Sequence, residues 1–152
     1  MIKYTAKYKV LDIAEYIIQK SSNMGNPIDH LKLQKILYYV QAKFLVEKNE
    51  KCFSDQILAW RFGPVVESVY RKYSKYSSMN LYPKNEIYQD NTIDSYDMNL
   101  IDSILQKYSD KNAWFLVEQT HREKPWVKTS QSSEIKVEDI RDYYSGEGKF
   151  SI

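Results

Sequence analysis

The sequence predicts a mostly α-helical fold, a compact single-domain bundle of six or seven helices with little or no sheet. Apolar residues recur at spacings of three and four along several segments, as they do on the buried face of a helix. Only four glycines and four prolines occur among the 152 residues, so few positions interrupt helices. A chain of this length is expected to form one domain, 1–152, and to bury roughly two-thirds of its unfolded surface.

Two helices are expected before residue 50. In "KYKVLDIAEYIIQKS" (7–21) the apolar side chains form one stripe, and "SNMGNP" (22–27) then indicates a turn. The second helix lies in "PIDHLKLQKILYYVQAKFLVEKN" (27–49), where Asp29 is well placed to cap the first turn. Apolar residues cover much of the circumference of this helix, so we expect it at the centre of the fold.

The segment "AWRFGPVVESVYRKY" (59–73) places a glycine and a proline among large aromatic residues. Pro64 fits the first turn of a helix, where its missing N–H is not needed, and Gly63 readily adopts the conformation that precedes a proline. We therefore expect an extended approach, a sharp turn and a helix, with Trp60 and Phe62 packed against the second helix. The residues expected to face the core after the turn are Val65, Val66, Val69, Tyr70 and Tyr73.

Residues 77–93 are polar and indicate a loop, with a short hairpin around 80–92 as the alternative. Asp94 or Ser95 is expected to cap the helix that follows. The apolar stripe of that helix consists of Leu100, Ile101, Ile104, Leu105 and Tyr108.

Two short helices are expected after residue 112, with a turn and a further helix start between them. "AWFLVEQTH" (113–121) has few polar positions, which predicts a short, deeply buried helix. Pro125 is expected at a helix start, with Trp126 sealing an edge of the fold. "KVEDIRDYYS" (136–145) is the last predicted helix, and we expect 146–152 to be a frayed tail.

Cysteine content and hydropathy indicate the compartment. Cys52 is the only cysteine, so neither an intramolecular disulfide nor a cysteine-based zinc cage is expected, which fits a reducing environment. The first ten residues contain no apolar core of signal-peptide length, and no stretch of about 18 apolar residues occurs. We therefore expect a soluble, cytoplasmic protein without membrane contact.

The sequence contains no recognisable catalytic motif. There is no G-x-S-x-G, no phosphate-binding P-loop and no G-x-G-x-x-G. His30 and His121 are the only histidines, and a metal site could only be assembled across the fold. We therefore expect no catalytic residue, no metal and no cofactor, and predict that the protein is not an enzyme.

A basic stretch, 61–75, raises nucleic-acid binding as an alternative. Its lysines and arginines alternate with tyrosines, on which bases could stack. Net charge is +6 over residues 1–76 and −4 over 77–152, which could orient a charged partner. The overall pI of about 8.4 is low for a dedicated nucleic-acid binder, so nucleic acid is not the expected partner.

Three stretches resemble a known family when taken in this order and spacing: "LKLQKILYYVQ" (31–41), "AWRFGPVVESVYRKY" (59–73) and "THREKPW" (120–126). The chain is similar to the Panacea domain family, the SocA-like antitoxins of type II toxin–antitoxin systems, also described as phage-associated, GepA-like proteins. The resemblance covers about residues 8–145. It implies a small helical domain that is encoded beside a toxin gene and neutralises that toxin by binding it. One member is an adaptor that hands its toxin to a ClpXP-type protease, and this role is the second alternative.

The family pattern falls on apolar residues that suit a core and on five polar residues that packing explains less well. We expect some of these five to line one polar groove or buried network: Lys32, Gln34, Lys35, His121 and Glu123. For the toxin contact we expect an exposed patch of aromatic and charged side chains, because Tyr, Trp and Arg most often dominate interface energies. The candidate partner-binding residues are Tyr38, Tyr39, Arg61, Tyr70, Arg71, His121 and Trp126.

Overall fold

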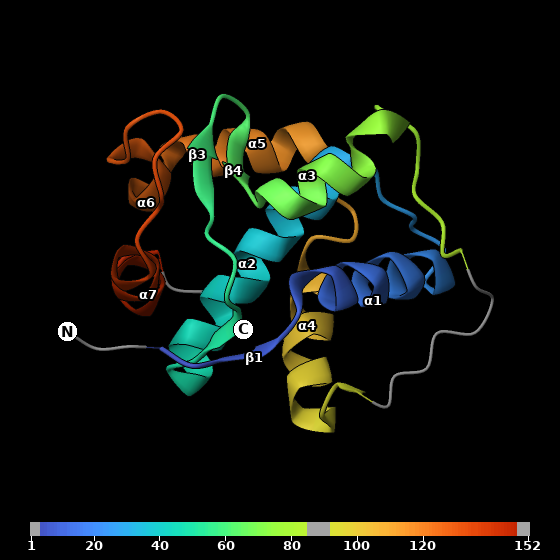
Figure 1. Ribbon diagram of the computed structural model, residues 1–152, viewed down its shortest axis with the longest axis horizontal. Coiled ribbons are helices and arrows are strands. Elements are labelled where there is room, and N and C mark those ends of the chain that lie inside the picture. The colour runs from blue at the N-terminus through green and yellow to red at the C-terminus, as the bar shows by residue number, and fades with distance from the viewer. Residues whose placement is uncertain (1–3, 85–91, 149–152) are drawn as a thin grey trace.

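A computed structural model of the chain describes residues 4–84 and 92–148, and this part is mostly helical (Figure 1). Its helices are α1 (Val10–Asn23), α2 (His30–Lys48), α3 (Glu67–Tyr73), α4 (Ser95–Lys107), α5 (Ala113–Arg122), α6 (Lys124–Val127) and α7 (Val137–Ser145), and a 3-10 turn, η1 (Ser74–Tyr76), follows α3. Its strands are β1 (Ala6–Tyr8), β2 (Lys51–Phe53), β3 (Leu58–Trp60) and β4 (Gly63–Val65). The predicted class, mostly α with little sheet, is confirmed.

Helix α2 is the central element, as its sequence predicts. It contacts α1, α3, α4, α5 and α7 and runs through the middle of the molecule in Figure 1. The Asp29 carboxylate accepts a hydrogen bond from the Lys32 backbone N–H at 2.8 Å, which confirms the predicted cap. The helix ends at Lys48 and is followed by the C-cap Asn49, whose φ of 55° is the left-handed conformation common after helices.

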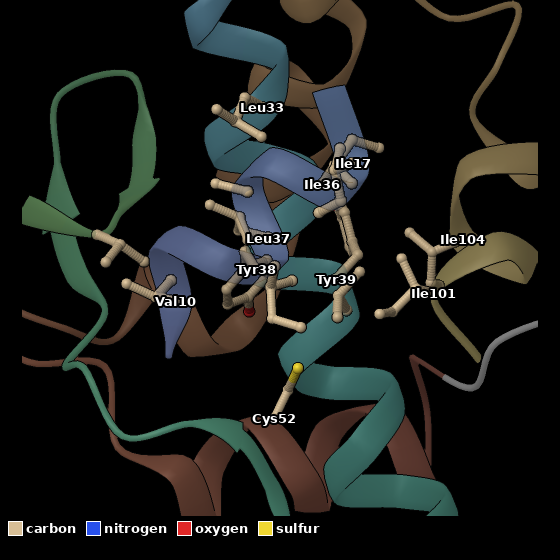
Figure 2. Close-up of a cluster of buried hydrophobic side chains, with 14 of the residues drawn as sticks. Val10, Ile17, Leu33, Ile36, Leu37, Tyr38, Tyr39, Cys52, Ile101 and Ile104 are labelled. Atoms are coloured by element: carbon tan, nitrogen blue, oxygen red, sulfur yellow. The ribbon is translucent and has the colours of Figure 1, made fainter. Parts of the chain in front are cut away.

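The core lies between α2 and the helices on either side of it. Figure 2 shows side chains of α1, α2 and α4 pointing toward one another, with Cys52 of β2 beneath them. The stripe predicted for α4 is buried along its whole length, from Leu100 to Tyr108. Burial of these apolar surfaces is the main driving force for the fold.

Two pairs of short strands accompany the helices. β1 runs parallel to β2, with Tyr8 opposite Phe53, and so brings the start of the chain beside the end of α2. β3 and β4 form an antiparallel hairpin, with Ala59 opposite Pro64. The chain therefore does arrive extended at Trp60, as expected, but it continues into a second strand.

The glycine–proline pair does not start a helix. Gly63 and Pro64 lie in β4, whereas α3 begins only at Glu67, so the predicted helix start at Pro64 is wrong. Ala59, opposite Pro64, makes its backbone hydrogen bonds to the segment 132–133 on the far side of β3. Ala59 and Pro64 are therefore a non-hydrogen-bonded pair, in which the backbone groups of both residues point away from the opposite strand. Pro64 lacks an N–H, but no hydrogen bond of the hairpin is lost at this position.

Two glutamines of α2, seven residues apart, form hydrogen bonds with backbone groups of β2 and of the residue that follows β4. Gln34 Oε1 accepts from the Val66 N–H at 2.8 Å, and Gln34 Nε2 donates to the Val66 carbonyl at 3.2 Å. Gln41 Oε1 accepts from the Cys52 N–H at 2.7 Å, and Gln41 Nε2 donates to the Phe53 carbonyl at 2.8 Å. Each side-chain amide therefore satisfies backbone groups as a neighbouring strand would.

Several local predictions have different outcomes. Residues 80–84 contain no strand, and 85–91 lie outside the described residues, as does 149–152 of the expected tail. Asp94 stands at the N-cap of α4 as predicted, but its carboxylate makes no cap hydrogen bond. It pairs with Lys7 instead. Pro125 does lie in the first turn of α6, as expected.

Candidate protein-interaction surface

Large aromatic side chains gather on the outside of the β3–β4 hairpin and α5. Phe62, at the hairpin turn, packs edge-on against Trp114 of α5, with ring centroids 5.2 Å apart. Phe62 remains 43 % exposed, Trp114 55 % and the adjacent Phe115 41 %. We call these three residues the aromatic row: Phe62 contacts Trp114, and Phe115 is the next residue in the sequence. Exposed large apolar groups brought together in this way are typical of protein-interaction sites.

A cation stands at each end of the aromatic row. The Arg61 guanidinium lies 5.3 Å from the centroid of the Phe62 ring, and Lys111 Nζ lies 4.9 Å from that of Phe115. Lys111 has the Asp110 carboxylate 4.0 Å away. Arg61 is exposed and forms no ion pair with any residue of 4–84 or 92–148. The surface therefore combines bare aromatic rings with an arginine whose charge is not neutralised locally.

Helix geometry explains why α5 exposes two aromatic residues. Its buried side chains follow the spacing of one helical stripe: Ala113, Leu116, Val117 and Thr120. Trp114 and Phe115 fall outside this stripe and therefore face solvent. The prediction of deep burial for 113–121 is wrong for both. The spacing within "AWFLV" could have revealed this, since a helix that packs on one side cannot bury five successive residues.

The hairpin is held from beneath by side chains of α2 and α6. Lys35 Nζ donates to the Pro64 carbonyl at 3.1 Å, and the Trp126 indole N–H donates to the Trp60 carbonyl at 3.0 Å. The position of Phe62 corrects a second expectation. Its ring packs against Trp114 of α5 and is partly exposed to solvent, whereas packing against α2 was expected.

Gly63 lets the hairpin approach its support closely. Its φ is +106°, a region that side-chain-bearing residues rarely adopt. A Cβ atom at this position would lie 2.7 Å from Lys35 Cε and 2.8 Å from Thr120 Oγ1. The hairpin thus sits against both α2 and α5 at a distance that only glycine permits.

Lys35 is fully buried although it carries an amine. Burial lowers its pKa to about 7, and the charge of Asp29 opposes this shift only in part. Burial is also the main cause of the lowered pKa of His30, to which the Lys35 charge adds. Close to neutral pH, much of Lys35 is therefore an uncharged amine that donates to the hairpin backbone.

A second polar cluster joins α2 and α7 to Glu123, the residue between α5 and α6. The Glu123 carboxylate accepts hydrogen bonds from the Tyr39 hydroxyl at 2.6 Å and the Tyr144 hydroxyl at 2.9 Å. Burial raises the pKa of Glu123, and the two hydroxyls counteract that shift. Burial likewise raises the pKa of Tyr108, here to about 12. Every polar group in this cluster has a partner, so it binds the helices to one another.

The structure divides the predicted partner-binding residues into three groups. Tyr38 and Tyr39 are buried in the core, where Figure 2 shows them on α2, so the prediction that they are exposed is wrong. Arg61, Tyr70 and Arg71 are exposed. Their role in binding stays a prediction.

His121 and Trp126 form the third group and lie behind the hairpin. Their rings stack with centroids 4.1 Å apart, and the Trp126 indole bonds to the Trp60 carbonyl. The Trp60 ring in turn packs edge-on against Tyr70, 5.0 Å away, which is 41 % exposed rather than inward-facing as expected. These residues support the hairpin from within.

The five polar residues of the family pattern do not line one groove. Lys32 donates to the Tyr108 carbonyl at 2.8 Å, whereas Gln34 and Lys35 hold β4 and Glu123 binds tyrosines. Gln34 and Lys35 are thus both buried and bind the same backbone stretch, 64–66, whereas Lys32 and Glu123 make separate contacts.

The basic stretch 61–75 is partly neutralised by carboxylates. Arg71 pairs with Glu67 at 3.4 Å, and Lys72 approaches Glu15 at 3.5 Å. Tyr73 is buried and donates its hydroxyl to Glu15, so it offers no stacking face. Less of this stretch is available to nucleic acid than its composition suggests.

The described residues form neither a metal site nor a membrane-spanning helix. Among residues 4–84 and 92–148, no three or more His, Cys, Asp or Glu side chains come together in a way that could hold a metal ion. In the same two ranges, no helix combines the length and apolar character needed to span a membrane.

Comparison with known proteins relates the chain to one family. Residues 33–127, which include the β3–β4 hairpin and all of α5, match the family described as antitoxin SocA-like, Panacea domain. A 62-residue segment is 39 % identical to antitoxin SocA of Caulobacter vibrioides (strain NA1000 / CB15N), covering 41 % of this chain and 33 % of that relative. The chain thus aligns with about a third of the relative's length. No solved structure matches.

Proposed function

This chain belongs to the antitoxin SocA-like Panacea domain family, and on that premise we propose that it is an antitoxin that neutralises a protein toxin by binding it directly. The observation that carries the proposal is the aromatic row with its flanking Arg61. Aromatic residues and arginine are the side chains most enriched where proteins bind one another. Here they are exposed on a hairpin that several buried contacts hold in place.

We further propose that the chain performs no reaction of its own. Three of its polar residues have structural partners: Gln34 and Lys35 hold β4, and Glu123 holds two tyrosines. These contacts give the three residues a role in supporting the fold that needs no substrate. His121 Nε2 has no hydrogen-bond partner among the described residues, and the His121 ring stacks on Trp126. Direct binding therefore accounts for the arrangement better than catalysis does.

A growth assay tests the antitoxin role. The product of the adjacent reading frame would be expressed from an inducible promoter, with and without this chain, and growth would be followed. We expect growth arrest without the chain, rescue with it, and co-purification of the two proteins. An adjacent product that is harmless, or a toxic one that the chain neither rescues nor binds, contradicts the proposal.

The same assay separates direct neutralisation from delivery to a protease. The half-life of the toxin would be measured in cells with and without ClpXP. Direct neutralisation predicts rescue in both strains with the toxin persisting in the complex. Rescue that disappears without ClpXP, together with a short toxin half-life in its presence, would show the adaptor mechanism instead.

A further inference from the structure

We propose that the aromatic row binds an acidic amphipathic segment of the partner, one whose apolar side chains lie on the rings while carboxylates at its border reach Arg61 and Lys111. This inference rests on the proposed function only in taking the partner to be a protein. It adds the chemistry of the segment that the surface selects.

The order of contacts gives the surface its pattern. Arg61 covers Phe62, Phe62 packs on Trp114, Phe115 follows in sequence, and Lys111 covers Phe115. One cation therefore lies beside Phe62 and another beside Phe115. A complementary partner segment would carry apolar residues between acidic ones, because interfaces match the sign of charge across the contact.

Exposed carboxylates on α5 and α3 have cationic partners of their own. Glu118, also on α5, pairs with Arg122 at 3.7 Å, and Glu67 on α3 pairs with Arg71 at 3.4 Å. Asp110 lies at the limit of ion-pair distance from Lys111. Arg61 has no such partner among the described residues.

Arg61 is therefore the residue that favours an acidic partner segment over a basic one. Covering a guanidinium without supplying an acceptor leaves a desolvated charge, which is costly. A carboxylate restores two parallel hydrogen bonds in a geometry that suits arginine. A basic segment would instead add repulsion at both ends of the aromatic row.

The support of the hairpin makes this preference effective. Lys35, Gly63 and Trp126 fix the position of the turn that carries Arg61 and Phe62. A surface that is already ordered loses little conformational freedom on binding, so more of the contact energy appears as affinity.

Two synthetic peptides can test the preference without knowledge of the partner. Both would be helical, with leucine and phenylalanine at spacings of three and four; one would carry glutamate at the remaining positions and its twin lysine. Binding to the full chain, labelled with nitrogen-15, would be followed by NMR through the indole signals of Trp60, Trp114 and Trp126. We expect the Trp114 signal to move most, and the acidic peptide to bind at least about tenfold more tightly than its twin.

Variants locate the effect. Arg61→Glu should weaken the acidic peptide at least about tenfold and reduce its salt dependence, and Trp114→Ala should weaken it similarly. Tyr96→Ala, which removes an exposed tyrosine at the start of α4 beside Lys48, is the matched control and should leave binding unchanged. Circular dichroism melts would establish that all three variants are folded, as expected for exposed positions.

Equal binding of the two peptides, no binding of either, or unchanged binding by Arg61→Glu overturns the acidic preference. If Trp114→Ala binds the acidic peptide as tightly as wild type, the peptide does not bind at the aromatic row. Rescue of growth by wild type and Arg61→Glu alike would overturn this inference while leaving the antitoxin role intact. Selective binding of the acidic peptide without rescue by wild type would overturn the antitoxin role alone.

Discussion

A buried lysine illustrates how single residues of this protein support the hairpin that carries the candidate interaction surface. Lys35 is fully buried, and its amine donates a hydrogen bond to the Pro64 carbonyl. Its Cε would lie 2.7 Å from a Cβ atom placed on Gly63. An uncharged amine can meet these demands inside an apolar environment, whereas an ammonium without a carboxylate cannot do so cheaply. The lowered pKa of Lys35 follows from this burial.

The pH dependence of stability should reveal Lys35. Because its pKa falls from 10.5 to about 7 on folding, the unfolded chain binds more protons between these values. The contribution of Lys35 to the free energy of unfolding therefore rises with pH across this window, by at most about 1.4 kcal/mol per pH unit.

Urea denaturation of wild type and Lys35→Met at pH 7, 8 and 9 measures this contribution. The difference in free energy of unfolding, wild type minus variant, should increase with pH, because methionine does not titrate. A difference that stays level would show that Lys35 keeps its ordinary pKa when buried.

Glu123 should matter for stability without contacting a partner. Glu123→Ala removes the acceptor of the Tyr39 and Tyr144 hydroxyls and leaves both buried donors with fewer partners. We expect a loss of roughly 2–4 kcal/mol in the free energy of unfolding. Thermal melting measures it; Glu118→Ala, on the exposed side of α5, is the control and should have little effect.

At the scale of elements, the β3–β4 hairpin connects the interior to the candidate surface. It uses side chains of α2 and α6 as its supports, and its turn carries Arg61 and Phe62. Position and exposure of the turn therefore depend on contacts more than 25 residues away in sequence. Changes beneath the hairpin should alter binding as well as stability.

Gly63→Ala tests how closely the hairpin is seated. The new Cβ would overlap Lys35 Cε and Thr120 Oγ1, and alanine disfavours a φ of +106°. We expect a loss of about 2–4 kcal/mol in the free energy of unfolding. Gly25→Ala is a matched control, because Gly25 also has positive φ, +77°, but nothing within 4 Å of its Cβ position. Equal losses for the two variants would mean that backbone strain alone, not seating, makes Gly63 necessary.

The strand edges depend on α2 in a similar way. Gln34→Leu would leave the Val66 N–H buried without a partner, while the Val66 carbonyl keeps its hydrogen bond from the Tyr70 N–H. The expected cost is roughly 1–3 kcal/mol. Gln106→Leu, at an exposed position of α4, should change stability by less than about 0.5 kcal/mol. Chemical denaturation of both variants compares these values, and a small effect for Gln34→Leu would indicate that water replaces the amide.

For the whole molecule, Asp97 joins parts that are far apart in sequence. Its buried carboxylate accepts from the Tyr8 hydroxyl at 2.5 Å and from Lys48 Nζ at 2.8 Å, with Lys7 Nζ at 3.3 Å. It thereby ties β1 and the end of α2 to α4. Burial by itself would raise the pKa of Asp97, but these three donors outweigh it and lower the pKa below its ordinary value.

Acid unfolding should depend on Asp97. Since its pKa is lower in the folded chain, its stabilising effect is present above the unfolded pKa near 3.8 and is lost as pH falls through the folded value. Asp97→Asn should therefore be less stable than wild type at pH 7, and the gap should narrow below pH 4. Circular dichroism across an acid titration measures both. A gap that is independent of pH would show that geometry, not charge, gives Asp97 its role.

The sequence by itself determined the helices, the central place of α2 and the cap at Asp29, because periodic spacing and capping act between residues a few positions apart. The resemblance of three motifs was equally local and indicated the family. Only the tertiary structure decided that Gly63 and Pro64 join a strand, that Tyr38 and Tyr39 are buried, and that Trp114 and Phe115 face solvent. These outcomes depend on which surfaces of distant segments meet, and side chains of the same type are buried or exposed according to the neighbour that packing provides.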